Sequence, residues 1–176
     1  MRKLKNTELN RKSIEEFKKA DKTPAIVVLD NIRSIHNVGS IFRTSDSFLI
    51  KKVYICGITA TPENQRMAKT ALGSTDSVDW EYVEEPKELI EKLERDNIII
   101  VSVEQANKSI KIQDFNPTNK SDYAFVFGNE VDGVREEFIK ASKHVLEIPQ
   151  VGTKHSLNVS VAAGIILWDF FDKKNI

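Results

Sequence analysis

Residues 148–162 read IPQVGTKHSLNVSVA, so a loop with Pro149 and Gly152 leads through Ser156 and Asn158 into an apolar helix. The first turn of a helix has unpaired backbone N–H groups, and hydroxyl and amide side chains beside it can hold a polar ligand. The same residues are also typical of a capped C-terminal helix after a tight turn. Two upstream loops with glycine and asparagine, each after a strand-like run, favour the ligand site.

Apolar runs that alternate with helical patterns indicate the fold class. Strands are predicted at 25–29, 52–58, 97–103, 123–127 and 144–148. Helices are predicted after a capping box at Ser13–Glu16, from Asn37 to Phe48, and over 62–71, 86–95, 135–141 and 158–173. Because continuous apolar runs suit strands buried on both faces, we expect an α/β fold with a mainly parallel sheet flanked by helices. Residues 23–176 form this domain, and residues 1–22 form a basic helical extension.

Composition narrows the classes of partner. The chain has 26 basic and 26 acidic residues, so its net charge attracts no polyanion. Residues 1–22 hold eight basic against four acidic residues, which indicates either a local patch that contacts nucleic acid or a solvated basic helix. The single cysteine, Cys56, excludes an internal disulfide, and the isolated His36 and His155 make a poor metal site. With no signal peptide and no apolar run of roughly 20 residues, we expect a cytoplasmic protein without a membrane span.

The predicted strand ends point to the site, because an open parallel sheet binds ligands beyond the C-terminal ends of its strands. These ends carry Asp30-Asn31-Ile32-Arg33, Ser102-Val103-Glu104, Gly128-Asn129-Glu130 and Pro149-Gln150-Val151-Gly152. Neither a dinucleotide-binding glycine pattern nor a P-loop is present, so those two classes have little support.

Two of these loops carry candidate chemistry. In the first, Asn37 is a predicted N-cap, and Arg43 suits a phosphate because its planar fork gives paired hydrogen bonds. The alternative is a surface arginine paired with Asp46. In the second, Gly128 leaves room for a ligand and Glu130 is placed to orient a hydroxyl or amine, although a plain turn explains the same residues.

Together the three loops resemble the three motifs of the SpoU family of RNA 2′-O-ribose methyltransferases, within the SPOUT superfamily. The motifs are Asn37-x-Gly39-x-Ile41-x-Arg43-Thr44, Phe127-Gly128-x-Glu130-x-x-Gly133, and Ile148-Pro149-x-x-Gly152 continued by Ser156-Leu157-Asn158-Val159-Ser160-Val161-Ala162. The resemblance covers residues 24–172 and includes Thr70-Ala71-Leu72-Gly73-Ser74 between the first two motifs. Gln150, where the family often has methionine, and Asn129 depart from the pattern.

The resemblance implies a C-terminal trefoil knot, S-adenosyl-L-methionine bound in the knotted loops, and a homodimer whose active sites are completed across the interface. One observation agrees independently with the dimer. The last predicted helix is apolar nearly all round, which exceeds what one core-facing stripe requires. A helix central to a monomer would look the same.

The resemblance also assigns residues. It implies that the cofactor contacts Val103, Gly128, Glu130, Ile148, Pro149, Gly152, Ser156, Leu157 and Asn158. The catalytic group would be Arg43, with Asn37, Glu130, Ser156 and Asn158 holding the reactants. Because free arginine stays protonated, we expect Arg43 to clamp a phosphate and stabilise the developing alkoxide. Arg11, Lys12, Arg33 and Arg43 are the predicted RNA-contacting residues.

The predicted reaction is methyl transfer to a ribose 2′-OH of structured RNA. We expect tRNA more than rRNA, since only a short basic helix precedes Pro24. One alternative is a catalytically silent knotted module that binds RNA but no methyl donor. Another is an α/β enzyme that acts on a small nucleotide. A cofactor titration separates the silent module from the enzyme, and methyl transfer without RNA would reveal the small-nucleotide enzyme.

Overall fold

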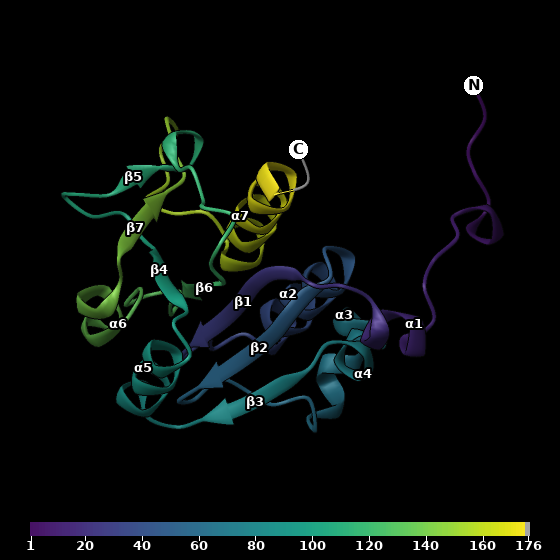
Figure 1. The fold of residues 1–176 in the computed structure, drawn as a ribbon, viewed down its shortest axis with the longest axis horizontal. Coiled ribbons are helices and arrows are strands. Elements are labelled where there is room, and N and C mark those ends of the chain that lie inside the picture. Colours follow the sequence, from purple (N-terminus) through teal and green to yellow (C-terminus); the bar gives the residue numbers. More distant parts are fainter. Residues whose placement is uncertain (175–176) are drawn as a thin grey trace.

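The computed structural model describes residues 1–174, and a seven-stranded sheet forms the centre of the fold, with the N-terminal segment extending away from it (Figure 1). The strand order is β3-β2-β1-β6-β4-β7-β5, and every neighbouring pair is parallel. The strands are β1 (Thr23–Asp30), β2 (Ile50–Cys56), β3 (Trp80–Val83), β4 (Ile99–Val103), β5 (Ile110–Lys111), β6 (Tyr123–Phe127) and β7 (His144–Glu147). The predicted α/β class with a mainly parallel sheet is confirmed.

Helices flank the sheet on both faces. The α-helices are α1 (Ile14–Lys19), α2 (Ile35–Ser47), α3 (Ala68–Ala71), α4 (Ser74–Ser77), α5 (Pro86–Arg95), α6 (Glu136–Ala141) and α7 (Val159–Lys174). Short 3₁₀ turns occur at η1 (Asn6–Glu8), η2 (Gln65–Met67) and η3 (Ile112–Asp114). In the described part of the chain, no helix is long and apolar enough to cross a bilayer.

Two strands were missed, and two predicted helix starts need correction. The sequence does not indicate β3 and β5, because these short strands at the two edges of the sheet lack a continuous apolar run. The helix predicted from residue 62 begins instead as the turn η2, where the Asn64 side chain accepts the Arg66 N–H. Helix α2 begins before Asn37, because Ser34 has extended backbone geometry and its hydroxyl accepts the Asn37 N–H. Asn37 therefore lies inside the first turn, and its side chain is free to bond elsewhere.

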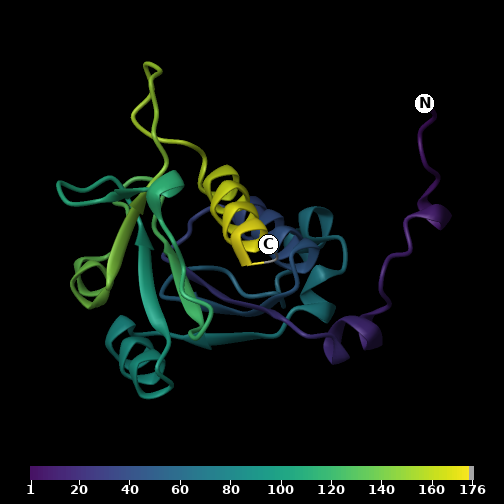
Figure 2. The same cartoon turned by 45° about the horizontal axis from the view of Figure 1, so that its top comes forward.

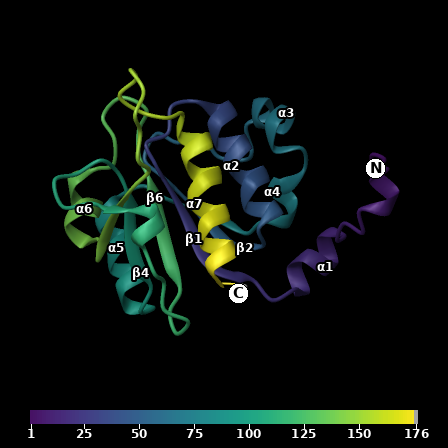
Figure 3. The same cartoon turned by 90° about the horizontal axis from the view of Figure 1, so that it is seen from above.

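Alternate residues of β1 face two separate apolar layers. Ala25, Val27 and Leu29 pack with the layer that contains α2 and α7, whereas Ile26 and Val28 pack with the layer that contains α5 and α6. Figure 3 shows α7 beside α2 over this central strand, and the two helices are in contact. The central strand is consequently covered on both sides, as expected for a parallel sheet.

The fold brings four strand ends together, since β1, β6, β4 and β7 are consecutive in the sheet. After β7 the chain rises in a narrow exposed loop before it enters α7 (Figure 2). The trefoil knot expected in this region stays a prediction. The capping box at Ser13–Glu16 is present, and Phe17 of α1 lies in the main core. The domain boundary at residues 22 and 23 stays a prediction.

Candidate functional site

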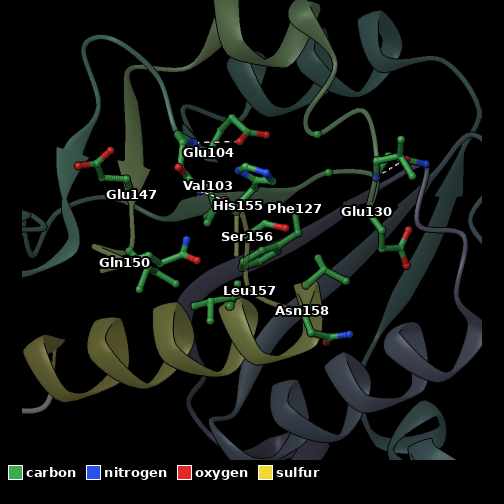
Figure 4. A pocket seen from close by; sticks show the side chains of 18 of the residues that line it. Val103, Glu104, Phe127, Glu130, Glu147, Gln150, His155, Ser156, Leu157 and Asn158 are labelled. Atoms are coloured by element: carbon green, nitrogen blue, oxygen red, sulfur yellow. Dashed lines mark hydrogen bonds between the residues drawn. The ribbon is translucent and has the colours of Figure 1, made fainter. Parts of the chain in front are cut away.

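A pocket of about 510 Å³ lies where the ends of β4, β6 and β7 meet the start of α7 (Figure 4). This volume suits a small-molecule ligand. The lining residues are Val103, Glu104, Gln105, Phe127, Gly128, Asn129, Glu130, Val131, Asp132, Gly133, Leu146, Glu147, Ile148, Gln150, His155, Ser156, Leu157, Asn158, Val159 and Ala162. The pocket thus lies at the predicted edge of the sheet.

Most of the predicted cofactor-contacting residues meet in this pocket. Those that line it are Val103, Gly128, Glu130, Ile148, Ser156, Leu157 and Asn158. Pro149 and Gly152 do not line it, and both are exposed. Gly152 belongs to the part of the loop that rises away from the body, where a Cβ added to it would have no neighbour within 4 Å. Gln150 lines the pocket instead.

The carboxylates that line the pocket have no lysine or arginine among the described lining residues to balance their charge. Glu104, Glu130, Asp132 and Glu147 line it, and its lining within residues 1–174 includes no lysine or arginine. Apolar walls come from the ends of β4, β6 and β7 and from Leu157. The pocket therefore combines apolar surface with carboxylates, which suits a ligand that has a flat ring and a positive charge.

One carboxylate joins the three predicted motifs. The side chain of Glu130 accepts the N–H groups of Arg33 at 3.0 Å and Ser34 at 3.1 Å, and the Asn37 amide at 2.9 Å. The Asn37 oxygen in turn accepts the Asn158 amide at 3.1 Å. These bonds fix the rotamer of Asn37 and hold the start of α2 against the start of α7.

Asn158 completes this network by capping α7. Its side-chain oxygen accepts the N–H of Ser160 at 2.9 Å and the hydroxyl of Ser160 at 2.6 Å. Both ends of the Asn158 amide are therefore engaged, the nitrogen with α2 and the oxygen with α7. This explains the capping pattern seen in the sequence, and the cap also ties two motifs together.

Asn129 stabilises the turn after β6. Its side-chain oxygen accepts the N–H groups of Val131 at 2.9 Å and Asp132 at 3.1 Å, and its amide donates to the Asn31 carbonyl at 2.7 Å. A residue that departs from the family pattern thus has a defined structural task, because it attaches the turn that carries Glu130 to the loop after β1.

Gly128 is required by the backbone of the same turn. A Cβ at this position would lie 2.2 Å from the carbonyl carbon of Gly133 and 2.2 Å from the nitrogen of Val134. The sequence predicted space for a ligand beside Gly128. The structure shows that the returning backbone occupies the Cβ side, although Gly128 still lines the pocket.

Arg43 lies outside the pocket of its own chain. It is exposed on α2, six residues beyond Asn37, which places it about 9 Å further along the helix axis. The predicted alternative, an ion pair with Asp46, does not form within residues 1–174, and Asp46 instead accepts a hydrogen bond from the Ser77 hydroxyl. The Arg43 side chain is thus available to a group outside this chain.

Asp30 has a structural position behind the site. It is completely buried, its carboxylate lies 2.6 Å from the Arg135 Nε, and it also accepts the Arg135 N–H at 2.9 Å. Burial raises the pKa of Asp30 despite these bonds. The pair fastens the end of β1 to the start of α6, so Asp30 is not a group that meets a ligand.

The predicted RNA-contacting residues do not form one patch on a single chain. Arg11 and Lys12 precede α1 and thus the beginning of β1, whereas Arg33 follows the end of β1. The eight residues of this strand span about 26 Å. Arg33 lies near the pocket, since its N–H bonds Glu130.

Several lining residues had no predicted role in the site. The rule on strand ends placed Glu104 at this edge of the sheet, but the resemblance assigned it no contact. Gln105 donates to the His155 carbonyl at 2.7 Å, and no local pattern indicates a contact between residues 50 apart. Within the described residues, no cluster of histidine, cysteine or acidic side chains could hold a metal ion.

Comparison with known proteins identifies the family. The family described as the SpoU rRNA methylase family matches residues 24–168. The chain belongs to this family. The resemblance of the three motifs is thereby confirmed, and the matched residues include the pocket and α2.

Individual relatives support the family and the fold. The chain is 30% identical over 145 residues to the 23S rRNA (guanosine-2′-O-)-methyltransferase RlmB of Neisseria meningitidis serogroup B, covering 82% of this chain and 56% of that protein. The crystal structure of the TrmH/SpoU tRNA modifying enzyme of A. aeolicus superposes with a TM-score of 0.80 at 26% identity, over 92% of this chain and 81% of that one. The crystal structure of the SpoU methyltransferase AviRb of Streptomyces viridochromogenes, in complex with AdoMet, superposes with a TM-score of 0.79 at 22% identity. The superposition covers 90% of this chain and 63% of that one.

The chain spans only 56% to 64% of the length of the curated relatives that it matches.

The bonds at Glu130 predict a pH-dependent contribution to stability. Burial raises the pKa of Glu130, but bonds from the Arg33 N–H, the Asn37 amide and the Ser34 N–H outweigh it, and the pKa is lowered overall. Ionised Glu130 therefore stabilises the fold above its unfolded pKa of about 4.3, and this contribution is lost as the pH falls through the lower folded pKa. Glu130→Gln should unfold about 1 kcal/mol more easily near pH 7, a small value because the side chain is exposed.

Urea unfolding at pH 7, 5 and 3 measures this difference, which should shrink toward the lowest pH. Glu94→Gln, at an exposed position of α5, is the control and should shift stability by less than about 0.5 kcal/mol. A Glu130→Gln effect that stays constant across the three pH values would contradict the assignment.

Proposed function

We propose that this chain is an RNA 2′-O-ribose methyltransferase that uses S-adenosyl-L-methionine. The observation that carries the proposal is the bonded chain Glu130–Asn37–Asn158, which joins all three motifs beside a pocket of suitable size. The names of the relatives support it, since they include methyltransferases of rRNA and a tRNA modifying enzyme. A cytoplasmic location is part of the proposal.

The pocket fits this cofactor by charge and shape. S-adenosylmethionine carries a net positive charge, and the lining offers four carboxylates and no basic side chain within the described chain. Nucleotides with phosphate groups would meet repulsion there, which disfavours a small-nucleotide enzyme. When bound, the cofactor supplies an electrophilic methyl group on sulfur. A structure of AviRb, a protein of the same fold, contains AdoMet.

The residues around the pocket have different roles in binding and orienting the reactants. Val103, Ile148 and Leu157 provide apolar walls for a purine ring, and Ser156 and Asn158 are placed to orient polar groups. Glu130 and Asn37 keep those groups in position through the bonds described above. Alignment of a ribose 2′-OH with the methyl group is worth about 7–11 kcal/mol in favourable cases.

Arg43 contributes charge to the reaction. Its guanidinium stays protonated, so it binds an RNA phosphate and stabilises the negative charge that develops on the 2′-oxygen. The proton of the ribose 2′-hydroxyl transfers to that phosphate or to water. The bond between the 2′-oxygen and the methyl carbon forms as the bond between the methyl carbon and the sulfur breaks.

A homodimer would bring Arg43 to a pocket. Val161, Ile165 and Trp168 lie along one side of α7 and are 50%, 36% and 55% exposed. This stripe begins beside the pocket, because Asn158 and Val159 line it, and α7 packs against α2, which carries Arg43. We therefore assign the stripe to a second copy of the chain, so that Arg43 of one protomer faces the pocket of its partner.

The RNA substrate is proposed as tRNA in preference to rRNA. Arg33 and Arg43 would contact phosphates near the reacting ribose, while Arg11 and Lys12 at the other end of β1 would contact a different part of the same RNA. The catalytically silent RNA-binding module remains the alternative, and intact Asn37, Arg43, Glu130, Ser156 and Asn158 count against it.

Transfer of a labelled methyl group tests the function. The full chain is incubated with labelled S-adenosylmethionine and with tRNA or rRNA from cells that lack this protein, and the RNA is then digested to nucleosides. We expect a 2′-O-methyl nucleoside in the tRNA fraction. The same product in rRNA alone would overturn the substrate preference, and no transfer to either RNA would favour the silent module.

Arg43→Ala tests the role of the guanidinium. Transfer should fall at least about 100-fold while cofactor affinity stays within about twofold, as expected for a contact made in the transition state. Arg95→Ala removes an exposed arginine of α5, on the opposite face of the sheet from α2, and should keep both properties. Equal losses of affinity and transfer in Arg43→Ala would refute the assignment.

Trp168→Asp tests the dimer. A carboxylate in the middle of the apolar stripe should convert the protein to a monomer and reduce transfer, since each pocket would lose the Arg43 of its partner. Light scattering coupled to gel filtration measures the mass. Ile14→Asp changes another exposed apolar residue, at 48% exposure on α1, and should leave the dimer intact. A wild-type protein that is monomeric at assay concentration would exclude the shared site.

A further inference from the structure

Glu104 is the pocket carboxylate whose role neither the three motifs nor the proposed mechanism explains. It follows the last residue of β4, at the edge of the sheet where the pocket lies. In Figure 4 it lies between the other two labelled glutamates that line the pocket, with Glu147 on one side and Glu130 on the other. Its central position makes it a candidate for direct contact with a ligand.

Backbone hydrogen bonds fix the Glu104 carboxylate in place. One oxygen accepts the N–H of Gln105 at 2.9 Å, and the other accepts the N–H of Val134 at 3.1 Å. A carboxylate has about four acceptor positions, two on each oxygen. One position on each oxygen is therefore left, at a side chain whose rotamer is already held.

Gly133 gives the carboxylate the space that it needs. This glycine has a φ of +73°, and a Cβ there would lie 2.3 Å from the Glu104 Oε2. A side chain at this position would therefore displace the Glu104 carboxylate. Gly133 is thus required by Glu104 as well as by the positive φ of the turn.

The other two glutamates of the pocket are less suited to a pair of donors from a ligand, and no hydrogen bond within residues 1–174 holds the Asp132 carboxylate in a fixed position. Glu130 already accepts three hydrogen bonds from the loop after β1 and the start of α2. Glu147 accepts the Ser109 hydroxyl at 2.7 Å, at the edge of the pocket next to β5. Glu104 alone among these three is held by bonds that leave one acceptor position on each oxygen.

We propose that Glu104 recognises the ribose of the cofactor by accepting hydrogen bonds from its 2′- and 3′-hydroxyls. The two free acceptor positions match the two hydroxyl donors, and a carboxylate at the C-terminal end of a parallel strand is well placed to bind a nucleoside ribose. This assignment rests on the proposed function, because it presumes that an adenosyl ligand enters the pocket.

Affinity for ligands that lack one hydroxyl tests the assignment. The probes are S-adenosylhomocysteine and its 2′-deoxy and 3′-deoxy derivatives, titrated calorimetrically into the full wild-type chain. Each deletion should weaken binding at least about tenfold, since hydrogen bonds to a charged group are the stronger kind. Wild-type protein that binds all three probes within about twofold would overturn the assignment without any variant.

Glu104→Gln separates recognition from structural support. A purely structural role would lower the affinity for all three probes by one common factor. We expect instead that the cost of deleting a hydroxyl falls below about threefold in this variant, because the amide is uncharged and has only one acceptor oxygen. Glu147→Gln, which changes another carboxylate of the same pocket, should lose as much affinity on deletion of a hydroxyl as the wild-type protein does. If Glu104→Gln also loses as much affinity as the wild type on each deletion, the proposal is overturned.

Two further outcomes are informative. If Glu104→Gln binds none of the probes, Glu104→Asp replaces it, and its shorter side chain should also reduce the cost of each deletion. If the wild-type chain binds neither S-adenosylhomocysteine nor S-adenosylmethionine, the proposed function itself fails, and the assignment fails with it. The titrations thus distinguish an error about this residue from an error about the cofactor.

Discussion

The carboxylate of Glu130 is the contact on which the arrangement of the site depends. Loops at the edge of a parallel sheet have no apolar core of their own, so polar bonds must hold them. Glu130 accepts two backbone N–H groups from the loop after β1 and the amide of Asn37, which then receives the amide of Asn158. Without this carboxylate, Asn37 would lose the bond that orients its amide, and the link from the start of α2 through Asn37 to Asn158 would be weakened. The buried Asp30–Arg135 pair supports the same region from behind by fixing the start of α6 to β1.

The fold could be predicted because its evidence is local, whereas the site could be predicted only in part. Apolar runs such as those of β4 and β6 indicate buried strands whatever surrounds them, and Pro86 begins α5 as expected. The N-cap of α2 was misassigned because Ser34 and Asn37 are both good caps, and the choice depends on Glu130, far away in the sequence. The contact from Gln105 to His155 likewise joins loops that only the folded sheet brings together.

Charge is distributed in a way that suits two ligands of opposite sign. The chain has no net charge, yet the pocket collects four carboxylates while Arg43 stays exposed outside it. In the proposed reaction, the negative pocket attracts the cofactor but repels the phosphates of RNA. A positive group must therefore approach the reacting ribose from outside the pocket. The position of Arg43 on α2, next to the exposed stripe of α7, is consistent with its delivery by a second protomer.

The turn after β6 couples the two halves of the pocket. Glu130 lies near one end of the turn and bonds the loop after β1, while Val134 at the other end donates to Glu104. Asn129 and Gly133 exchange backbone hydrogen bonds at 2.9 and 3.0 Å, which close the turn and tie the segment that carries Glu130 to the segment next to Val134. A ligand that contacts Glu104 therefore acts on the same turn that places Glu130. Cofactor binding and the positioning of Asn37 and Asn158 are, on this argument, not independent events.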